Sequence, residues 1–341
     1  MERKLSKNSN VLVEEEIRPE RLKLSQAPLL AEDIKWLISQ RNKFVKVPCP
    51  ACGSKKEREL FRKLGLRYCI CYGCQTIYVN PRPSPKVLEE YYATSKNYNF
   101  WNKYIFPASE KARRIKIFRP RAERLVELCR KYGSRREVLL EVGAGFGTFC
   151  EEIMGKRFFK RVIAIEPTPD LACTCKSKGI DVIALPVEQV KFGGIKADVV
   201  ASFEVIEHLF NASDFIKKCA GLISKGGLLI LTCPNSKGFD LATLGKASES
   251  FDHEHLNYFH PESLSSCIRE HGFDIIEVST PGKLDAELVR KAALEGRIDL
   301  SDRPLLNYIL IKHWNELGSD FQQFLVDNGL SSHMWIVGRK R

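Results

Sequence analysis

The stretch that most constrains the fold of this 341-residue chain is Val138-Leu-Leu-Glu-Val-Gly-Ala-Gly-Phe-Gly-Thr-Phe-Cys150. Its first five residues, 138–142, are mostly apolar, which predicts a buried parallel strand. Three glycines follow at alternate positions, ahead of a segment able to form a helix: Gly143, Gly145 and Gly147. Glycine lacks a Cβ and permits a tight turn, and a helix amino terminus offers free N–H groups. A ligand can therefore approach bare backbone at this turn.

The glycines follow the spacing G-x-G-x-G, which differs from the G-x-G-x-x-G fingerprint of dinucleotide-binding folds. Glu141, one residue before the end of the strand, would repel a pyrophosphate but suits an ammonium group. The motif resembles the E/D-x-G-x-G-x-G motif of class I S-adenosylmethionine (SAM) dependent methyltransferases. That resemblance implies a Rossmann-like α/β fold with a seven-stranded sheet, and SAM bound at Glu141 and the three glycines. A plain strand–helix turn of another doubly wound fold is the alternative.

Strands and helices alternate from residue 137 onward, which predicts a parallel sheet with helices on both faces. The expected parallel strands are 138–142, 161–165, 181–184, 197–203 and 226–232. Two further strands, 272–279 and 333–339, are expected to form the antiparallel end of the sheet.

Further cofactor-binding candidates lie where these strands end. Glu166 follows the second strand, where an acid can bind both hydroxyls of a ribose, and the family resemblance assigns it to the SAM ribose. Val187 and Glu188 are weaker candidates for the side of the adenine. Phe203 and Glu204 resemble the family's fourth motif, beneath the methionine part of SAM. This motif lacks the Asn/Asp-Pro-Pro-Tyr/Phe signature of amino-group methyltransferases, which argues against methylation of adenine or cytosine amino groups.

Two C-x-x-C pairs stand near the amino terminus, formed by Cys49 with Cys52 and by Cys71 with Cys74. Four thiolates at this spacing are typical of a closed, structural zinc site. Metal binding would supply folding energy to a module too small for a core of its own. A redox role for a single pair is the alternative, and the duplication argues against it.

A second informative stretch is Phe251-Asp-His-Glu-His-Leu-Asn-Tyr-Phe-His-Pro261. It follows the fifth expected strand, near the sheet edge where open α/β folds bind ligands. A second metal site, or a loop whose histidines only cap the next helix, would also account for it. The stretch resembles the sugar C-methyltransferases that act on nucleotide-linked deoxysugars and carry a zinc ribbon. In those enzymes a Glu-His pair assists proton removal, which by position implies Glu254 and His255; where they have a tyrosine, this chain has Asp252.

The expected reaction needs a base, because a sugar hydroxyl or a carbon beside a ketone is a poor nucleophile until it loses a proton. Histidine is the side chain whose ordinary pKa lies nearest working pH. His255 is therefore the expected general base, with Glu254 orienting it or binding a hydroxyl. His208 either reaches the same pocket or finishes a helix turn. The remaining substrate candidates are His253, Tyr258 and Tyr92. Tyr92 belongs to an aromatic region, 91–106, that either packs between the ribbon and the main domain or contacts the substrate, with packing favoured.

The whole chain sets further limits. Its net charge of +12 favours an anionic partner, either a nucleotide-linked small molecule or nucleic acid. We expect a cytoplasmic protein, because its twelve cysteines are scattered, its amino terminus is polar and it lacks an apolar run of membrane length. A homo-oligomer is a further expectation. The expected domains are a helical leader (1–46), a zinc ribbon (47–83), a helical linker on the substrate side (84–135), the SAM-binding core (136–282) and C-terminal helices with the last strand (283–341).

The expected function is transfer of a methyl group from SAM to a sugar that is nucleotide-linked or part of a glycan or natural-product precursor. A zinc-ribbon RNA methyltransferase is the first alternative, since the basic charge permits it. The chain shows no clear stripe of Lys and Arg interleaved with stacking aromatics, which disfavours nucleic acid. A SAM-binding scaffold without turnover is the second alternative, and the candidate bases argue against it.

Overall fold

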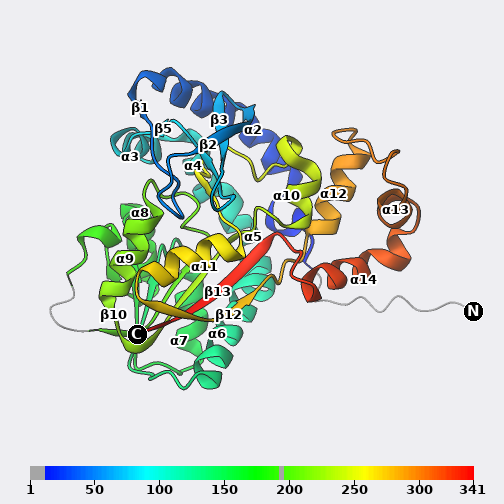
Figure 1. Ribbon diagram of the computed structural model, residues 1–341. Helices are drawn as coiled ribbons and strands as arrows, with labels where there is room; N and C mark the ends of the chain where they lie inside the picture. The colour runs from blue at the N-terminus through cyan, green and yellow to red at the C-terminus, as the bar shows by residue number, and fades with distance from the viewer. Residues whose placement is uncertain (1–11, 192–195) are drawn as a thin grey trace, which may run out of the picture.

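The computed structural model describes residues 12–191 and 196–341 (Figure 1), so that part of the expected leader, residues 1–11, lies outside the described residues. A seven-stranded mixed sheet forms the centre, in the order β12-β13-β10-β9-β6-β7-β8. The five strands from β10 to β8 in this order run parallel, and β13 pairs antiparallel with both β10 and β12. The expected fold class is therefore confirmed. The strands are β6 (Val138–Val142), β7 (Arg161–Ile165), β8 (Asp181–Ile183), β9 (Ala197–Phe203), β10 (Ile223–Pro234), β12 (Phe273–Ser279) and β13 (His333–Lys340).

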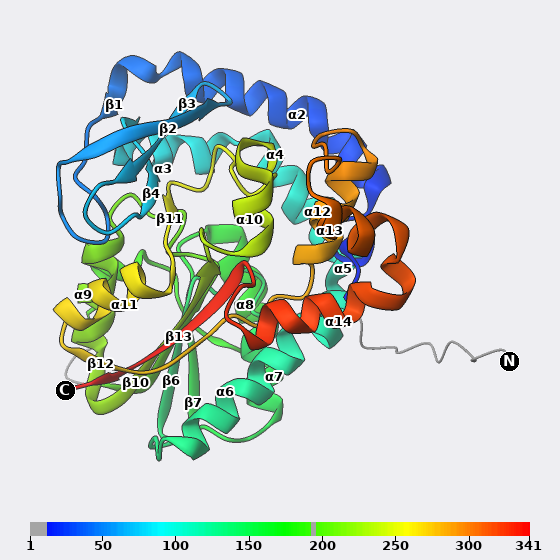
Figure 2. The same cartoon turned by 45° about the vertical axis from the view of Figure 1, so that its right-hand side comes forward.

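Successive residues along the central strands pack into different cores, because side chains alternate across a strand. Leu139 and Val199 join the core beneath α6, α7 and α8, whereas Leu140 and Val200 join the core beneath α9 and α11. Figure 2 shows these helices on the two sides of the sheet. The helices are α6 (Arg119–Lys131), α7 (Thr148–Gly155), α8 (Pro169–Ser177), α9 (Ala212–Leu222) and α11 (Pro261–Glu270).

The amino-terminal ribbon is a small antiparallel sheet in the order β11-β4-β3-β2. Its strand β11 (Asn257–Tyr258) comes from the histidine-rich stretch of the main domain, and it pairs with β4 (Ile77–Val79). The ribbon is thereby joined through backbone hydrogen bonds to the segment that follows His255. The other ribbon strands are β2 (Glu57–Lys63) and β3 (Leu66–Cys71), and the short pair β1 (Phe44–Val45) and β5 (Arg82–Pro83) lies beside them.

Two helical segments of the leader and the linker are irregular. In the leader, α2 (Glu20–Ser39) contains Pro28. Proline removes one helix hydrogen bond, and Leu24, whose carbonyl loses that donor, is 71% exposed. In the linker, α5 (Phe106–Arg113) and α6 are joined by a π-helical turn, η3 (Arg114–Phe118). The rest of the leader and linker is α1 (Glu14–Ile17), α3 (Pro85–Thr94), α4 (Lys96–Phe100) and η2 (Trp101–Ile105).

A group of short helices at one side of the molecule (right in Figure 1) has a hydrophobic core of its own. Its helices are α10 (Phe239–Leu244), α12 (Asp285–Leu294), α13 (Pro304–Asn307), η6 (Tyr308–Lys312) and α14 (Trp314–Asp327). One of them, α13, begins at Pro304. Among the residues described, no helix is both long and apolar enough to cross a membrane.

Candidate active site

The glycine turn after β6 is closed at both ends and open in the middle. A Cβ on Gly143 would lie 2.5 Å from Val205 Cγ2, and one on Gly147 would lie 2.6 Å from Ile180 Cδ1. Gly145 has a φ of +55°, yet a Cβ there would have no described atom within 4 Å. All three glycines have a left-handed backbone (φ +78°, +55° and +70°), which favours glycine, and packing adds to this at Gly143 and Gly147. Gly145 has its open side available to a ligand.

Glu166, just after β7, holds the open part of the turn. Its carboxylate accepts hydrogen bonds from Gly145 N (2.8 Å) and Thr168 N (2.9 Å), one on each oxygen. Each carboxylate oxygen can accept a second bond, so both remain able to bind hydroxyls. Burial raises the pKa of Glu166. Burial raises the pKa of Tyr98 on α4, and the charge of Glu166 adds to this shift.

Glu141 points from β6 toward the start of α7, where the Cys150 thiol donates a hydrogen bond to it (2.9 Å). Burial raises the Glu141 pKa to about 8, although Cys150 and Arg121 oppose the shift. A cation near this carboxyl would favour its ionised form.

Arg121 is a charged residue that the sequence reasoning missed. Its guanidinium lies 4.4 Å from the centre of the Phe203 ring and 4.0 Å from Glu204 Oε1, and its side chain is 10% exposed. Burial lowers the Arg121 pKa, and the negative charges of Glu204 and Glu141 oppose that shift. The signal that could have found Arg121 is its position on α6, four residues before the buried Leu125 and thus on the inner face of the helix.

Glu204 adopts a left-handed backbone, with φ +56°, directly after β9. Its Oε1 accepts a hydrogen bond from Thr232 Oγ1 (2.5 Å) and lies 2.8 Å from His333 Nε2. Burial alone would raise its pKa, but His333 and Arg121 outweigh burial and lower it to about 2. Phe203 is buried beneath Arg121. The two weaker adenine candidates diverge: Val187 is buried in the core, and Glu188 is exposed in η4 (Val187–Gln189).

Asp252 shapes the turn that carries the expected base. Its Oδ1 accepts hydrogen bonds from the backbone N–H groups of Glu254 and His255, both at 2.8 Å. His255 Nδ1 lies 2.9 Å from the backbone oxygen of Ser250. Since a carbonyl oxygen can only accept, Nδ1 carries a proton, and in the neutral ring Nε2 is the nitrogen with the lone pair. Ser250, and not Glu254, makes the hydrogen bond to Nδ1; that Glu254 orients His255 or binds a hydroxyl stays a prediction.

His208 does reach the same place as His255. The two rings are 4.6 Å apart between their centres, and they come from different loops. Burial, together with His255, lowers the His208 pKa to about 3, so this imidazole is neutral near pH 7. Glu207, the residue before it, is 1% exposed. The fourth motif and the histidine-rich stretch thus meet at one point.

The Tyr91 hydroxyl contacts both His253 and Glu254 of the histidine-rich stretch. It lies 2.5 Å from His253 Nε2 and donates to Glu254 Oε1 (3.0 Å). The Tyr92 ring packs edge-on against both Tyr91 (5.4 Å) and Tyr98 (5.8 Å). The aromatic region therefore runs from the histidine-rich stretch toward Glu166. It packs, as favoured from the sequence, and whether it also lines a substrate stays a prediction.

Arg82 connects the ribbon to both histidine-bearing loops and is fully buried. Its guanidinium donates to the backbone oxygens of Val79 (3.1 Å), Phe210 (3.0 Å) and Leu256 (3.1 Å), and to Asn257 Oδ1 (2.9 Å).

Tyr258 lies in β11, beside the ribbon strand β4. Its ring packs against Phe251 and Tyr68, and its hydroxyl donates to Ser250 O (3.0 Å). The predicted substrate residue Tyr258 is thus placed in the packing between the ribbon and the main domain.

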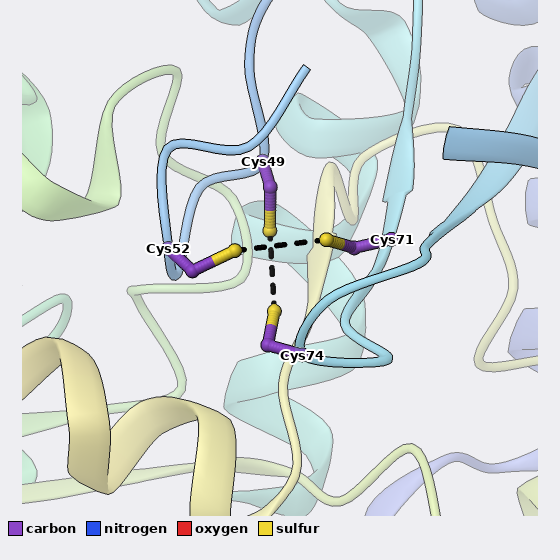
Figure 3. A group of neighbouring side chains, drawn as sticks. All are labelled: Cys49, Cys52, Cys71 and Cys74. Atoms are coloured by element: carbon purple, nitrogen blue, oxygen red, sulfur yellow. Dashed lines mark hydrogen bonds between the residues drawn. The ribbon is translucent and has the colours of Figure 1, made fainter. Parts of the chain in front are cut away.

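The four cysteines of the ribbon point toward one centre (Figure 3). The Cys49 and Cys74 sulfurs are 3.4 Å apart, and the Cys52 and Cys71 sulfurs are 3.6 Å apart. A tetrahedral site with Zn–S bonds of about 2.3 Å has sulfurs roughly 3.8 Å apart. The cluster is therefore compatible with a zinc ribbon.

A family model described as a methyltransferase domain matches residues 112–278. The chain carries a SAM-dependent methyltransferase domain. The match begins in α5 and ends in β12, so the methyltransferase domain includes Arg121, the glycine turn, Glu166 and both histidine-bearing loops. The ribbon and most of the C-terminal helices lie outside it.

Curated relatives of the methyltransferase domain include two ubiquinone biosynthesis O-methyltransferases. The protein of Bradyrhizobium diazoefficiens is 29% identical over 115 residues, which cover 31% of this chain and 44% of the relative. That of Rhizobium rhizogenes is 26% identical over 186 residues, or 51% of this chain and 71% of the relative. The chain thus spans less than half the length of the first relative. A solved SAM-dependent methyltransferase from Clostridium acetobutylicum, 11% identical, covers 70% of this chain and 98% of its own, with a TM-score of 0.47.

Proposed function

We propose that this protein transfers the methyl group of SAM to a hydroxyl or an acidic carbon of a small-molecule sugar, nucleotide-linked or part of a glycan or natural-product precursor. The observation that carries the proposal is the Nε2 lone pair of His255, which is directed by Ser250 and held within the methyltransferase domain. SAM supplies an electrophilic methyl group on a sulfonium, and the acceptor must lose a proton to attack it.

The residues around the glycine turn fit SAM. Gly145 presents open backbone, and Glu166 can bind the ribose hydroxyls while it holds the turn. The ammonium group of SAM suits the buried carboxyl of Glu141, and its carboxylate suits the guanidinium of Arg121. Both charges of the methionine part would therefore have a buried partner of opposite sign.

His255 then acts as the general base in the proposed reaction. Its Nε2 takes the proton of the acceptor, and the Nδ1 hydrogen bond to Ser250 stabilises the imidazolium that forms. Glu254 and the Tyr91 hydroxyl, 3.0 Å apart, can bind a neighbouring hydroxyl of the sugar. Holding both reactants in line supplies much of the rate. The net charge of +12 supports an anionic, nucleotide-linked acceptor.

The ribbon completes the proposal as a structural zinc module. Zinc on the four cysteines would stiffen the sheet that includes β11, two residues beyond His255. No catalytic step is assigned to this zinc.

A phenolic hydroxyl is the second candidate acceptor, because the two curated relatives are named for O-methylation in ubiquinone biosynthesis. The same base would serve, since a phenol also reacts after losing its proton. RNA remains the third, with the basic charge in its favour.

Labelled SAM distinguishes these acceptors. The purified protein is incubated with it and with three pools: nucleotide sugars, catechol-type phenols and total RNA. We expect label in the nucleotide sugars, and its loss in His255→Ala. The matched control is His313→Ala, a histidine that packs on the Tyr308 ring in the C-terminal helices. Label in phenols or RNA alone would replace the sugar as acceptor, and label in no pool would favour a scaffold.

A further inference from the structure

A group of three metal-ligand side chains stands apart from the cysteines of the ribbon. Glu207, His208 and His255 each place one ligand atom within 4.8 Å of the other two. Glu207 and His208 follow β9, and His255 comes from the stretch before β11. Two imidazole nitrogens and one carboxylate oxygen form a ligand set typical of divalent first-row transition metals.

The state of Glu207 is an independent indication that the group takes a cation. Its side chain is 1% exposed, and Oε2 is buried without a hydrogen-bond partner among the residues described. Burying a carboxyl that lacks a partner is costly. Glu204 and Asp252 add negative charge around Glu207, with Arg121 opposing them. A positive ion between Glu207 and the two histidines would satisfy the orphaned oxygen and offset this charge.

His255 has the hydrogen bond that usually orients a metal-binding histidine. His255 Nδ1 donates to the Ser250 carbonyl, and this fixes the ring so that Nε2 is the coordinating atom. Metal–nitrogen bonds of about 2.1 Å place tetrahedral ligands roughly 3.4 Å apart. Side-chain rotations that move each ligand atom by about 1 Å would therefore bring the three atoms to coordination distance from one ion.

We propose that Glu207, His208 and His255 bind one divalent transition-metal ion, such as Zn²⁺ or Co²⁺, separately from the ribbon. Nε2 of His255 has one lone pair, which either coordinates the ion or accepts the proton of the substrate. The ion therefore inhibits methyl transfer, and removing it restores the base. This consequence for turnover rests on the proposed function, whereas the binding does not.

Cobalt titration tests the binding. The full chain, freed of metal under reducing conditions, is titrated with Co²⁺, and bound ions are counted by elemental analysis. We expect two ions in the wild type and in His313→Ala, and one in Glu207→Gln and in His208→Ala. The remaining ion should keep the thiolate charge-transfer absorption of a four-cysteine site, which shows that the ribbon of each variant is folded. Equal counts in the wild type and both variants would overturn the proposal.

Turnover gives the separate readout. Saturating Zn²⁺ should slow methyl transfer by about 100-fold or more, the usual contribution of a general base, and a chelator too weak to strip the ribbon should restore it. Full activity with the second ion bound would contradict the competition. A chain that binds two ions but methylates no sugar would refute the proposed acceptor and leave the metal site standing.

Discussion

His255 Nδ1 lies 2.9 Å from the backbone oxygen of Ser250, five residues earlier in the same loop. The contact leaves Nε2 as the basic nitrogen, and it depends on a turn that Asp252 holds through two backbone N–H groups. The arrangement of the proposed base is therefore local to residues 250–255, although the loop itself is anchored by the ribbon.

Replacing Asp252 with alanine should loosen this turn. We expect Asp252→Ala to lower kcat by up to ~100-fold, since small displacements of a catalytic group have effects of that size, with little change in SAM affinity. Asp252→Asn keeps an acceptor oxygen for the Glu254 and His255 N–H groups, so most of the rate should return. Steady-state kinetics with calorimetric SAM binding measure both. Equal losses in the two variants would show that the charge of Asp252 matters rather than its hydrogen bonds.

Arg82 should matter both for stability and for the position of the two histidine-bearing loops. Arg82→Lys removes the fork that serves the oxygens of Val79, Phe210 and Leu256, and leaves buried acceptors unpaired. We expect the free energy of unfolding to fall by about 2–4 kcal/mol, and kcat to fall more than the affinity for SAM. Urea unfolding and kinetics measure these effects. If Arg82→Lys is as stable and as active as the wild type, Arg82 does not hold the histidine-bearing loops in position.

Much of this arrangement follows from local sequence patterns. The strands and the glycine turn were predicted because apolar runs and glycine spacing are read directly from neighbouring residues. The contacts of Arg121 with Phe203 and of Tyr91 with His253 were not, because they depend on how helices cross the sheet and on where the linker returns. The hydrogen bond from His255 Nδ1 goes to Ser250, whose backbone oxygen leaves no signal in the sequence.

Asp240 should make stability depend on pH. Burial raises its pKa from 3.8 to about 7, and Asp285 adds to the shift. Between these values the folded chain holds a proton that the unfolded chain has released, so stability falls as pH rises from about 4 to 7. Asp240→Asn cannot ionise and should remove part of this loss, on the order of 2–4 kcal/mol at about 1.4 kcal/mol per pKa unit.

Denaturant unfolding at pH 5 and pH 8 measures that effect. The control is Asp320→Asn, an exposed acid on α14, which should keep the pH dependence of the wild type. Identical pH dependence in the two variants would contradict the assigned protonation of Asp240.

Glu141 should release a proton when SAM binds. With a pKa of about 8, its carboxyl is mostly protonated at pH 7, and the ammonium of SAM favours the ionised form. The binding enthalpy of the wild type should therefore change with the ionisation enthalpy of the buffer, and affinity should rise from pH 6 to pH 8. Glu141→Gln should lose the buffer dependence and bind about 10-fold more weakly, since one charge-assisted hydrogen bond is lost. Buffer-independent enthalpies in the wild type would exclude this role.

The central claim is that SAM binds at the turn formed by Gly143, Gly145 and Gly147, with Glu166 on its ribose. A crystal structure of the chain with S-adenosylhomocysteine, the product of methyl transfer, tests it most directly. The account predicts the adenosine part against the open side of Gly145, with both ribose hydroxyls in hydrogen-bond contact with Glu166. An empty turn, or one that binds a nicotinamide dinucleotide in place of this ligand, would contradict it.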